Sequence, residues 1–153
     1  MRNKTRIFVL LFVITIFISG CDLFKGLMGT TVSIEERIVL FQTELNKEDR
    51  SEIYLHFHPD TQNRQQIAAS EVIETGPLAY DYQPYAINIV SQSDPDSAGK
   101  VTVSCGLVNK NTTSDNPYDL TLIMQEGEKN VWYIRELHLT VGKETYTIKR
   151  IGI

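Results

Sequence analysis

Two histidines and an aspartate stand at alternate positions in the middle of the chain, at His56, His58 and Asp60. In an extended segment, alternate side chains share one face, so these three would offer two imidazoles and a carboxylate to a zinc ion. On a helix, the two imidazoles would point about 200° apart and would not share a metal. The apolar spacing of Ile53 and Phe57 favours the helix. We therefore expect no metal here: a histidine near a helix C-terminus interacts favourably with the helix dipole, and Asp60 caps the next helix.

A second pair of side chains, Glu136 and His138, lies in an alternating stretch near the C-terminus. Alternation predicts one strand face made of Trp132, Ile134, Glu136 and His138, and an opposite face made of Tyr133, Arg135, Leu137 and Leu139. On a concave surface, a carboxylate beside an imidazole makes a general acid and base pair. The polar end of a half-buried strand is the simpler interpretation. Catalysis by Glu136 and His138, in a small hydrolase or lyase, is therefore the alternative to a binding function.

Three tyrosines fall within six residues, at Tyr80, Tyr82 and Tyr85. Tyrosine offers rigid amphipathic area and is favoured at interfaces. The cluster predicts the rim of a ligand pocket or a docking surface for a partner protein. Ordinary packing and hydrogen bonding at a sheet edge is the alternative interpretation.

Several other signals of chemistry are missing from the sequence. It has no glycine-rich phosphate loop, no serine nucleophile motif and no paired-cysteine metal site, so we expect no cofactor. The 153 residues carry 15 Lys and Arg against 19 Asp and Glu, a net charge of −4. Nucleic acid is bound through basic patches, so an acidic chain is not expected to bind it.

The elements that must position these residues begin with a helix. Ser33 and Glu36 form a capping box, in which each side chain accepts from the other residue's backbone N–H. The next apolar residues are spaced by four, three and four, which places them on one helical face: Ile34, Ile38, Phe41 and Leu45. A second helix is expected over 48–57. A short third helix is expected from residue 60 or 61 to residue 69.

From residue 80 onward the apolar period changes to two, which is typical of strands. Strands are expected over 85–90, 100–109, 120–125, 131–139 and 144–151, separated by turn-forming residues. The connection at 126–129 is short enough to make its two flanking strands a hairpin. Helices first and an antiparallel meander afterwards predict an α+β fold.

The helix pair with an aspartate-bearing turn over 41–58, followed by strands and a tryptophan-bearing hairpin over 126–139, resembles the NTF2-like, or cystatin-like, superfold. The resemblance covers about residues 33–151 and is one of topology. It implies N-terminal helices packed on a curved antiparallel sheet, with a pocket at the open end of this cone. Such folds include dehydratases, isomerases and non-catalytic binding modules, and they often dimerise, so the fold alone does not choose a function.

The N-terminal residues have the pattern of an export signal. Three basic residues precede an apolar run over 7–18, which is shorter than the roughly 20 residues that span a bilayer core. The run ends in Ile18-Ser19-Gly20-Cys21, which resembles the lipobox of bacterial lipoproteins. That resemblance implies removal of residues 1–20 and acyl chains such as palmitate on Cys21, enough to anchor the protein firmly. An ordinary signal peptide or an uncleaved anchor is the alternative.

Without residues 1–20 the chain keeps twelve basic and nineteen acidic residues, a net charge of −7. We expect residues 21–32 to be a lipidated N-terminus with a flexible tether, and 33–153 to form a single domain. If Cys21 is lipidated, Cys105 has no intramolecular disulfide partner. Cys105 alternates with Val103 and Leu107, so it is expected in the core.

The expected function is therefore that of a non-catalytic binding module. The protein would be held by lipid at the cell membrane or outer membrane, with its domain on the exported side. Its expected partners are a small ligand or another envelope protein, and a homodimer is possible.

Overall fold

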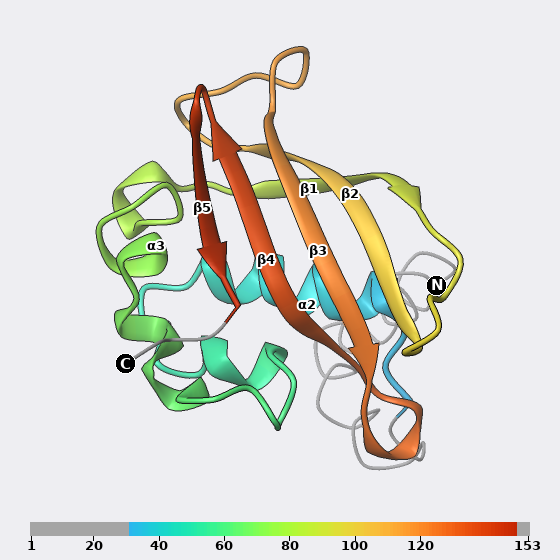
Figure 1. The fold of residues 1–153 in the computed structure, drawn as a ribbon. Helices are drawn as coiled ribbons and strands as arrows, with labels where there is room; N and C mark the ends of the chain where they lie inside the picture. The colour runs from blue at the N-terminus through green and yellow to red at the C-terminus, as the bar shows by residue number, and fades with distance from the viewer. Residues whose placement is uncertain (1–30, 150–153) are drawn as a thin grey trace, which may run out of the picture. The chain divides into compact units, whose positions relative to one another are not determined.

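The computed structural model describes residues 31–149 (Figure 1). The predicted signal peptide, Cys21 and most of the predicted tether lie outside these residues. Within residues 31–149, no helix is long and apolar enough to cross a membrane. Val32 already belongs to the folded structure, because it forms a parallel bridge with Val131 and its carbonyl accepts from the Trp132 N–H at 2.9 Å.

A five-stranded antiparallel sheet forms one layer of the fold, with the strands in chain order from edge to edge. Its strands are β1 (Ala86–Gln92), β2 (Lys100–Val108), β3 (Tyr118–Glu126), β4 (Trp132–Val141) and β5 (Glu144–Ile148). The predicted meander is confirmed, although β5 ends earlier than predicted. The face of the sheet toward the helices carries the buried apolar residues of each strand, such as Val103, Leu122 and Leu137, which lie opposite one another in register.

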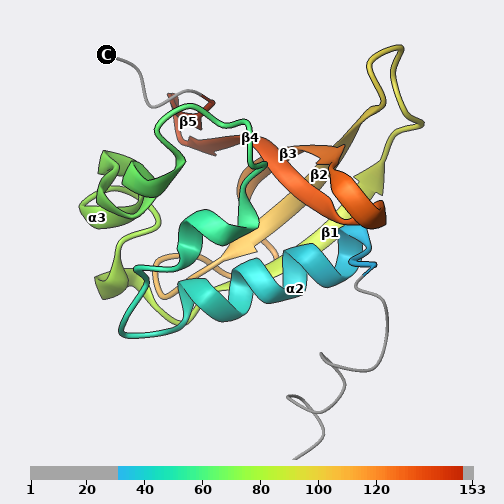
Figure 2. The same ribbon diagram turned by 90° about the horizontal axis from the view of Figure 1, so that it is seen from below.

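Helix α2 (Ile34–Leu45) packs across that apolar face, and Figure 2 shows it running along one side of the sheet. The predicted capping box is confirmed: the Glu36 N–H donates to Ser33 Oγ at 3.1 Å and the Ser33 N–H donates to Glu36 Oε2 at 2.9 Å. The four predicted apolar positions of this helix are all buried. Burial of a full side chain of this kind stabilises the fold by about 1.5–3 kcal/mol. The fold class is thus α+β.

Helix α2 also closes the outer edge of the sheet, next to β1. The side chain of Asn46 pairs with Tyr85 as a neighbouring strand would: its amide donates to the Tyr85 carbonyl at 2.8 Å, and its oxygen accepts from the Tyr85 N–H at 2.8 Å. Gln42 Oε1 accepts from the Ile87 N–H at 2.7 Å. These bonds satisfy backbone groups that an edge strand otherwise leaves open.

The predicted second and third helices are wrong in type and extent. The second is only the 3-10 helix η2 (Ile53–His56), and the third is the 3-10 helix η3 (Arg64–Ala69). Asp49 Oδ1 accepts from the Ser51 N–H at 2.9 Å, a local bond that competes with helix formation. Phe57 is extended and bridges to Ile134 of β4, which pulls the chain out of the helix.

The predicted cap of the third helix is also wrong. Its N-cap is Asn63, which has a left-handed backbone, rather than Asp60 or Thr61. Two short elements follow before the sheet begins, the helix α3 (Glu71–Glu74) and the 3-10 helix η4 (Tyr80–Tyr82).

Strand β4 contains a bulge that alternation along the sequence did not reveal. Glu136 lies opposite Ile123, whereas the next pair along the ladder is Ile134 with Met124, so Arg135 is the extra residue. Ile134 is therefore buried together with Leu137 and Leu139 rather than sharing a face with Glu136. The prediction that Ile134, Glu136 and His138 share one face is wrong on this point, although Glu136 and His138 do share a face.

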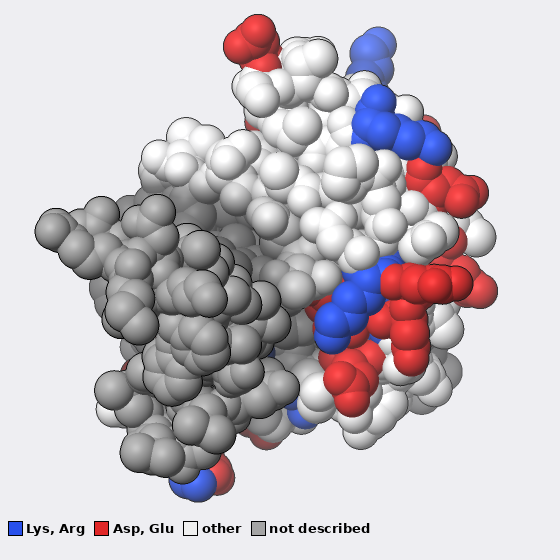
Figure 3. All heavy atoms as spheres, turned by 180° about the vertical axis from the view of Figure 1, so that it is seen from behind, with Lys and Arg blue, Asp and Glu red and all other residues white. Residues whose placement is uncertain are grey.

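Cys105 lies in the core, as predicted, and is a free thiol with an exposed fraction of 4%. Burial raises the pKa of its thiol to about 11, so the reactive thiolate is suppressed. On the face seen from behind, acidic and basic side chains of the described residues lie next to one another (Figure 3).

Candidate functional site

A hollow of about 180 Å³ opens at one end of the sheet, against the segment that contains α3 and η4. We call it the tyrosine hollow, and its lining residues are Thr75, Gly76, Pro77, Tyr82, Asn109, Asn111, Tyr118, Val141 and Tyr146. Tyr118 lies opposite the buried Leu107, and Tyr146 lies opposite the buried Leu139. The strands therefore present these two rings on the face of the sheet that the helices cover.

The lining of the hollow carries no charged side chain. Three phenol rings supply flat apolar area, and each hydroxyl supplies a polar edge. The Tyr146 hydroxyl donates to Glu144 Oε2 at 2.7 Å, and this bond raises the pKa of Tyr146. The position of Tyr82 is fixed by Lys110, whose N–H donates to the Tyr82 carbonyl at 3.1 Å and whose ammonium lies 5.9 Å from the ring centroid.

Asn109 is the polar residue of the hollow with an unmet hydrogen bond. It is buried, with an exposed fraction of 4%. Its Oδ1 accepts from the Asn111 N–H at 2.9 Å, and its own N–H donates to Thr112 Oγ1 at 2.7 Å. The first bond fixes the orientation of the amide, which leaves Nδ2 buried without an acceptor among the described residues. A buried donor without a partner costs about 1–3 kcal/mol.

The three tyrosines singled out in the sequence have three different places. Only Tyr82 lines the hollow. Tyr85 is buried and its hydroxyl donates to the carbonyls of Pro77 and Ala79, while Tyr80 is exposed to 51%. Tyr80 and Tyr85 instead flank the guanidinium of Arg50, which lies 5.7 Å from each ring centroid.

Arg50 explains why two of those tyrosines are held together. Its exposed fraction is 8%, and its Nη1 donates to the Leu78 carbonyl at 2.5 Å. Burial lowers the pKa of Arg50, and the neighbouring phenol rings offset part of that cost. The tyrosine cluster is thus partly structural, and its binding role remains a prediction that rests on Tyr82.

Glu136 and His138 come together as a pair, with Oε2 and Nε2 3.2 Å apart. Both face away from the helices, because Glu136 lies opposite Ile123 and His138 lies opposite Thr121 on the outer face of the sheet. The other ring nitrogen, Nδ1, is 3.1 Å from Thr147 Oγ1. Both imidazole nitrogens are therefore engaged by the protein's own groups, and neither residue lines the tyrosine hollow. A catalytic role for the pair remains a prediction.

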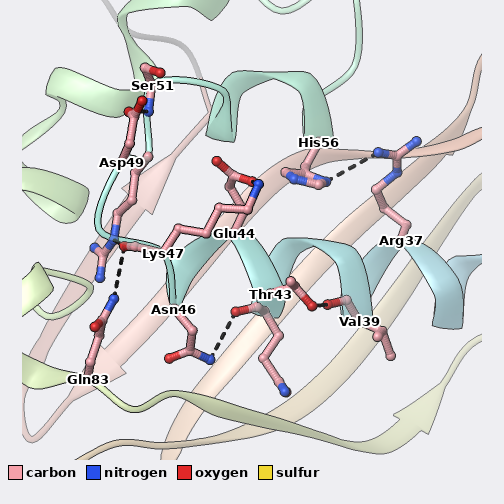
Figure 4. A network of polar contacts seen from close by, with 12 residues as sticks. Arg37, Val39, Thr43, Glu44, Asn46, Lys47, Asp49, Ser51, His56 and Gln83 are labelled. Carbon is pink, nitrogen blue, oxygen red and sulfur yellow. Dashed lines mark hydrogen bonds and ion pairs between the residues drawn. The ribbon is translucent and has the colours of Figure 1, made fainter. Parts of the chain in front are cut away.

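His56 and His58 each face an arginine. His56 ends η2, and its Nδ1 is 3.3 Å from Nη1 of Arg37, as Figure 4 shows. His58 Nδ1 is 3.3 Å from Nη1 of Arg135 and accepts from the Asp60 N–H at 3.2 Å. The Asp60 carboxylate is 3.8 Å from the same nitrogen. Among residues 31–149, no three His, Cys, Asp or Glu side chains are grouped to hold a metal.

The environment keeps both imidazoles neutral near pH 7. Burial, and then the charge of Arg37, lower the pKa of His56 to about 4. Burial and the charge of Arg135 lower the pKa of His58, and the Asp60 carboxylate only partly opposes this. Neutral imidazoles can accept the guanidinium N–H groups that face them.

Sequence reasoning missed Asn109, Tyr118 and Tyr146 as residues of the site. Tyr118 and Tyr146 look like ordinary strand positions in the sequence, although their alternation with Leu120 and Ile148 places them on the buried face. Comparison of the chain with protein-family models, curated proteins and solved structures found no match.

Proposed function

We propose that this protein is a lipid-anchored binding module of the bacterial cell envelope, and that it binds a small uncharged ligand in the tyrosine hollow. The observation that carries the proposal is the lining of the hollow, which brings three tyrosines and two asparagines around a volume of about 180 Å³. Their hydroxyl and amide groups can form hydrogen bonds with a neutral ligand, and the tyrosine rings can pack against its apolar face.

The lining indicates the chemistry of the ligand. Flat rings from Tyr82, Tyr118 and Tyr146 favour a ligand with an apolar face, and the uncharged lining gives no counter-ion to a charged one. A volume of about 180 Å³ is small, so the hollow suits a single sugar-like or amide-bearing unit, free or at the end of a larger partner molecule. A protein of the envelope that presents such a unit is the corresponding macromolecular partner.

The anchor rests on the N-terminal sequence, which ends its apolar run at Cys21. Acylation of Cys21 would hold the domain at the cell membrane or outer membrane on the exported side. The α+β arrangement of helix and five-stranded meander supports the resemblance to the NTF2-like superfold, whose members often bind ligands at the open end of the sheet. We propose that the domain belongs to that superfold.

A ligand screen with matched variants tests the binding proposal. Neutral sugars and small amides are screened by the rise in melting temperature of the full chain in a non-ionic detergent. Val141→Trp fills the hollow, whereas Tyr80→Ala removes an exposed ring outside it. A ligand of the hollow raises the melting temperature of the wild type and of Y80A but not of V141W. Equal shifts in wild type and V141W would place the binding elsewhere and refute the proposal.

A further inference from the structure

Helix α2 covers only part of the open edge of β1. Asn46 forms hydrogen bonds with the backbone of Tyr85, and Gln42 accepts from the N–H of Ile87, so the helix and the strand run in opposite directions. These two side chains share one stripe of the helix, because residues three or four apart lie on the same face. The next position along that stripe is Val39, which has no polar group to offer the strand. The side-chain cover of the edge therefore ends at Ile87.

Ile89 is the residue at which the edge becomes open. Three or four residues of helix advance about 5 Å and two residues of strand about 6.6 Å, so Val39 lies beside Ile89. Backbone groups alternate in direction along a strand, and the N–H and C=O of Ile89 point away from β2, as the N–H of Ile87 does. Among residues 31–149, the side chains of α2 and its C-cap bond to this edge only at Tyr85 and Ile87. Ile89 therefore offers a donor and an acceptor to another strand.

Apolar side chains surround this opening. Ile89 lies opposite the buried Cys105, so its side chain is on the helix side of the sheet, yet its exposed fraction is 41%. Val90 is the extra residue of a bulge in β1 and is exposed to 75%, and Val39 is exposed to 60%. We call these three residues, Val39, Ile89 and Val90, the open seam. A contiguous exposed apolar patch is typical of an interaction site.

Acidic side chains flank the open seam. Glu35 stands on the same stripe of α2 as Val39, one turn nearer the start of the helix, and Asp94 lies two residues beyond the end of β1. Both acidic residues are exposed, and neither forms an ion pair within residues 31–149. Basic side chains on a partner would complement these charges.

A second copy of the chain would fit the open seam poorly. The chain has a net charge of −4, and two copies joined at β1 would bring Glu35 and Asp94 of both copies to one interface. A bulge such as that at Val90 twists an edge strand and hinders its pairing with another whole sheet. A short peptide avoids this hindrance, because it needs to pair with only a few residues. A basic peptide in an extended conformation is therefore the occupant that the charge and the shape of the strand favour.

We propose that the open seam binds an extended basic peptide segment of a partner protein, which adds to β1 as a further strand at Ile89. Main-chain hydrogen bonds to Ile89 hold the peptide, and its apolar side chains pack against Val39 and Val90. A lysine or arginine of the peptide pairs with Glu35. The open seam is separate from the tyrosine hollow, with which it shares no residue.

Peptide binding to the full chain in a non-ionic detergent tests this proposal by fluorescence anisotropy. The probe is a labelled peptide in which valine and threonine alternate between terminal lysines, and a second probe carries terminal glutamates instead. Val39→Gln places an amide beside Ile89, where it can bond to the open backbone as Gln42 does at Ile87. The matched control is Leu40→Gln, which changes an exposed apolar residue on another stripe of the same helix. Glu35→Lys reverses the charge beside the open seam.

We expect wild type and L40Q to bind the lysine peptide with the same affinity and to bind the glutamate peptide more weakly. V39Q should bind the lysine peptide about ten-fold more weakly than the wild type, the factor expected from the loss of one or two hydrogen bonds. E35K should lose the preference for the lysine peptide.

Three results would overturn the proposal. The first is that the wild type does not bind the lysine peptide, and the second is that wild type and V39Q bind it equally. The third comes from sedimentation of the same proteins without peptide: a wild-type dimer that V39Q abolishes would assign the open seam to a second copy of the chain.

Discussion

Acid should weaken the fold through His56. This side chain is 8% exposed, its Nδ1 is 3.3 Å from Arg37, and its ring meets Phe41 edge-on with centroids 6.0 Å apart. Burial, followed by the positive charges of Arg37, Lys47 and Arg64, opposes protonation and lowers its pKa from 6.5 to about 4. The unfolded chain has no such environment, so its His56 takes up a proton at an ordinary pH.

The sign and size of the effect follow from linkage. Above the unfolded pKa of 6.5, His56 is neutral in both states and costs nothing. Between that value and about 4, the unfolded state binds a proton that the folded state does not. The free energy of unfolding therefore decreases as the pH is lowered through this range. Going from about pH 7.5 to about pH 4.5, this one residue is expected to remove about 2.5 kcal/mol.

The assay is urea unfolding of the wild type and two variants at both pH values. His56→Asn keeps an acceptor near the position of Nδ1 but does not titrate in this range. His138→Gln removes the half-exposed histidine on the other face of the sheet and serves as the matched control. Because carboxylates titrate in all three proteins, the quantity compared is the difference between proteins in the stability lost on acidification.

We expect H56N to lose about 2.5 kcal/mol less than the wild type on acidification, and H138Q not to show this smaller loss. Equal losses in wild type and H56N would refute the reasoning, because His56 would then be protonated with equal ease in the folded and unfolded states. If H138Q rather than H56N lost less stability on acidification, the acid-sensitive group would lie on the outer face of the sheet.

Three further outcomes concern the elements that position the site. Ser33→Ala removes the capping box of α2 and should lower the free energy of unfolding by about 1 kcal/mol, measured in urea, whereas Ser97→Ala in an exposed loop serves as its control. Asn46→Ala opens the edge of β1 at Tyr85 and should cost about 2 kcal/mol in the same assay; a cost near zero would show that water replaces those bonds. Cys105 should react with a thiol reagent only at the rate of unfolding, and fast labelling of the native protein would contradict its place in the core.

The sheet was predictable from the sequence because a strand that buries one face has apolar residues at alternate positions. Val101, Val103 and Cys105 alternate with polar neighbours, so the strand and its buried face could both be predicted. The region between α2 and β1 was not predictable in the same way. There, a local bond from Ser51 to Asp49 and the pairing of Phe57 with Ile134 decide the backbone, and neither leaves a periodic signal.

The candidate site was harder still to predict. The β4 bulge at Arg135 shifts the phase of alternation by one residue, so a strictly alternating pattern assigns Ile134 to the wrong face. The tyrosine hollow draws Tyr82, Tyr118 and Tyr146 from segments far apart in the chain. The unmet donor of Asn109 depends on a turn whose geometry is set by its neighbours, and the sequence alone does not specify it.

Native mass spectrometry of the protein isolated from the cells that make it would test directly whether the tyrosine hollow holds a ligand. The wild type should carry a non-covalent adduct of small mass, and Val141→Trp, isolated in the same way, should lack it. Under denaturing conditions, both proteins should show the mass of a chain that begins at an acylated Cys21. An adduct of equal abundance in wild type and V141W, or none in either, would contradict a ligand site in the hollow.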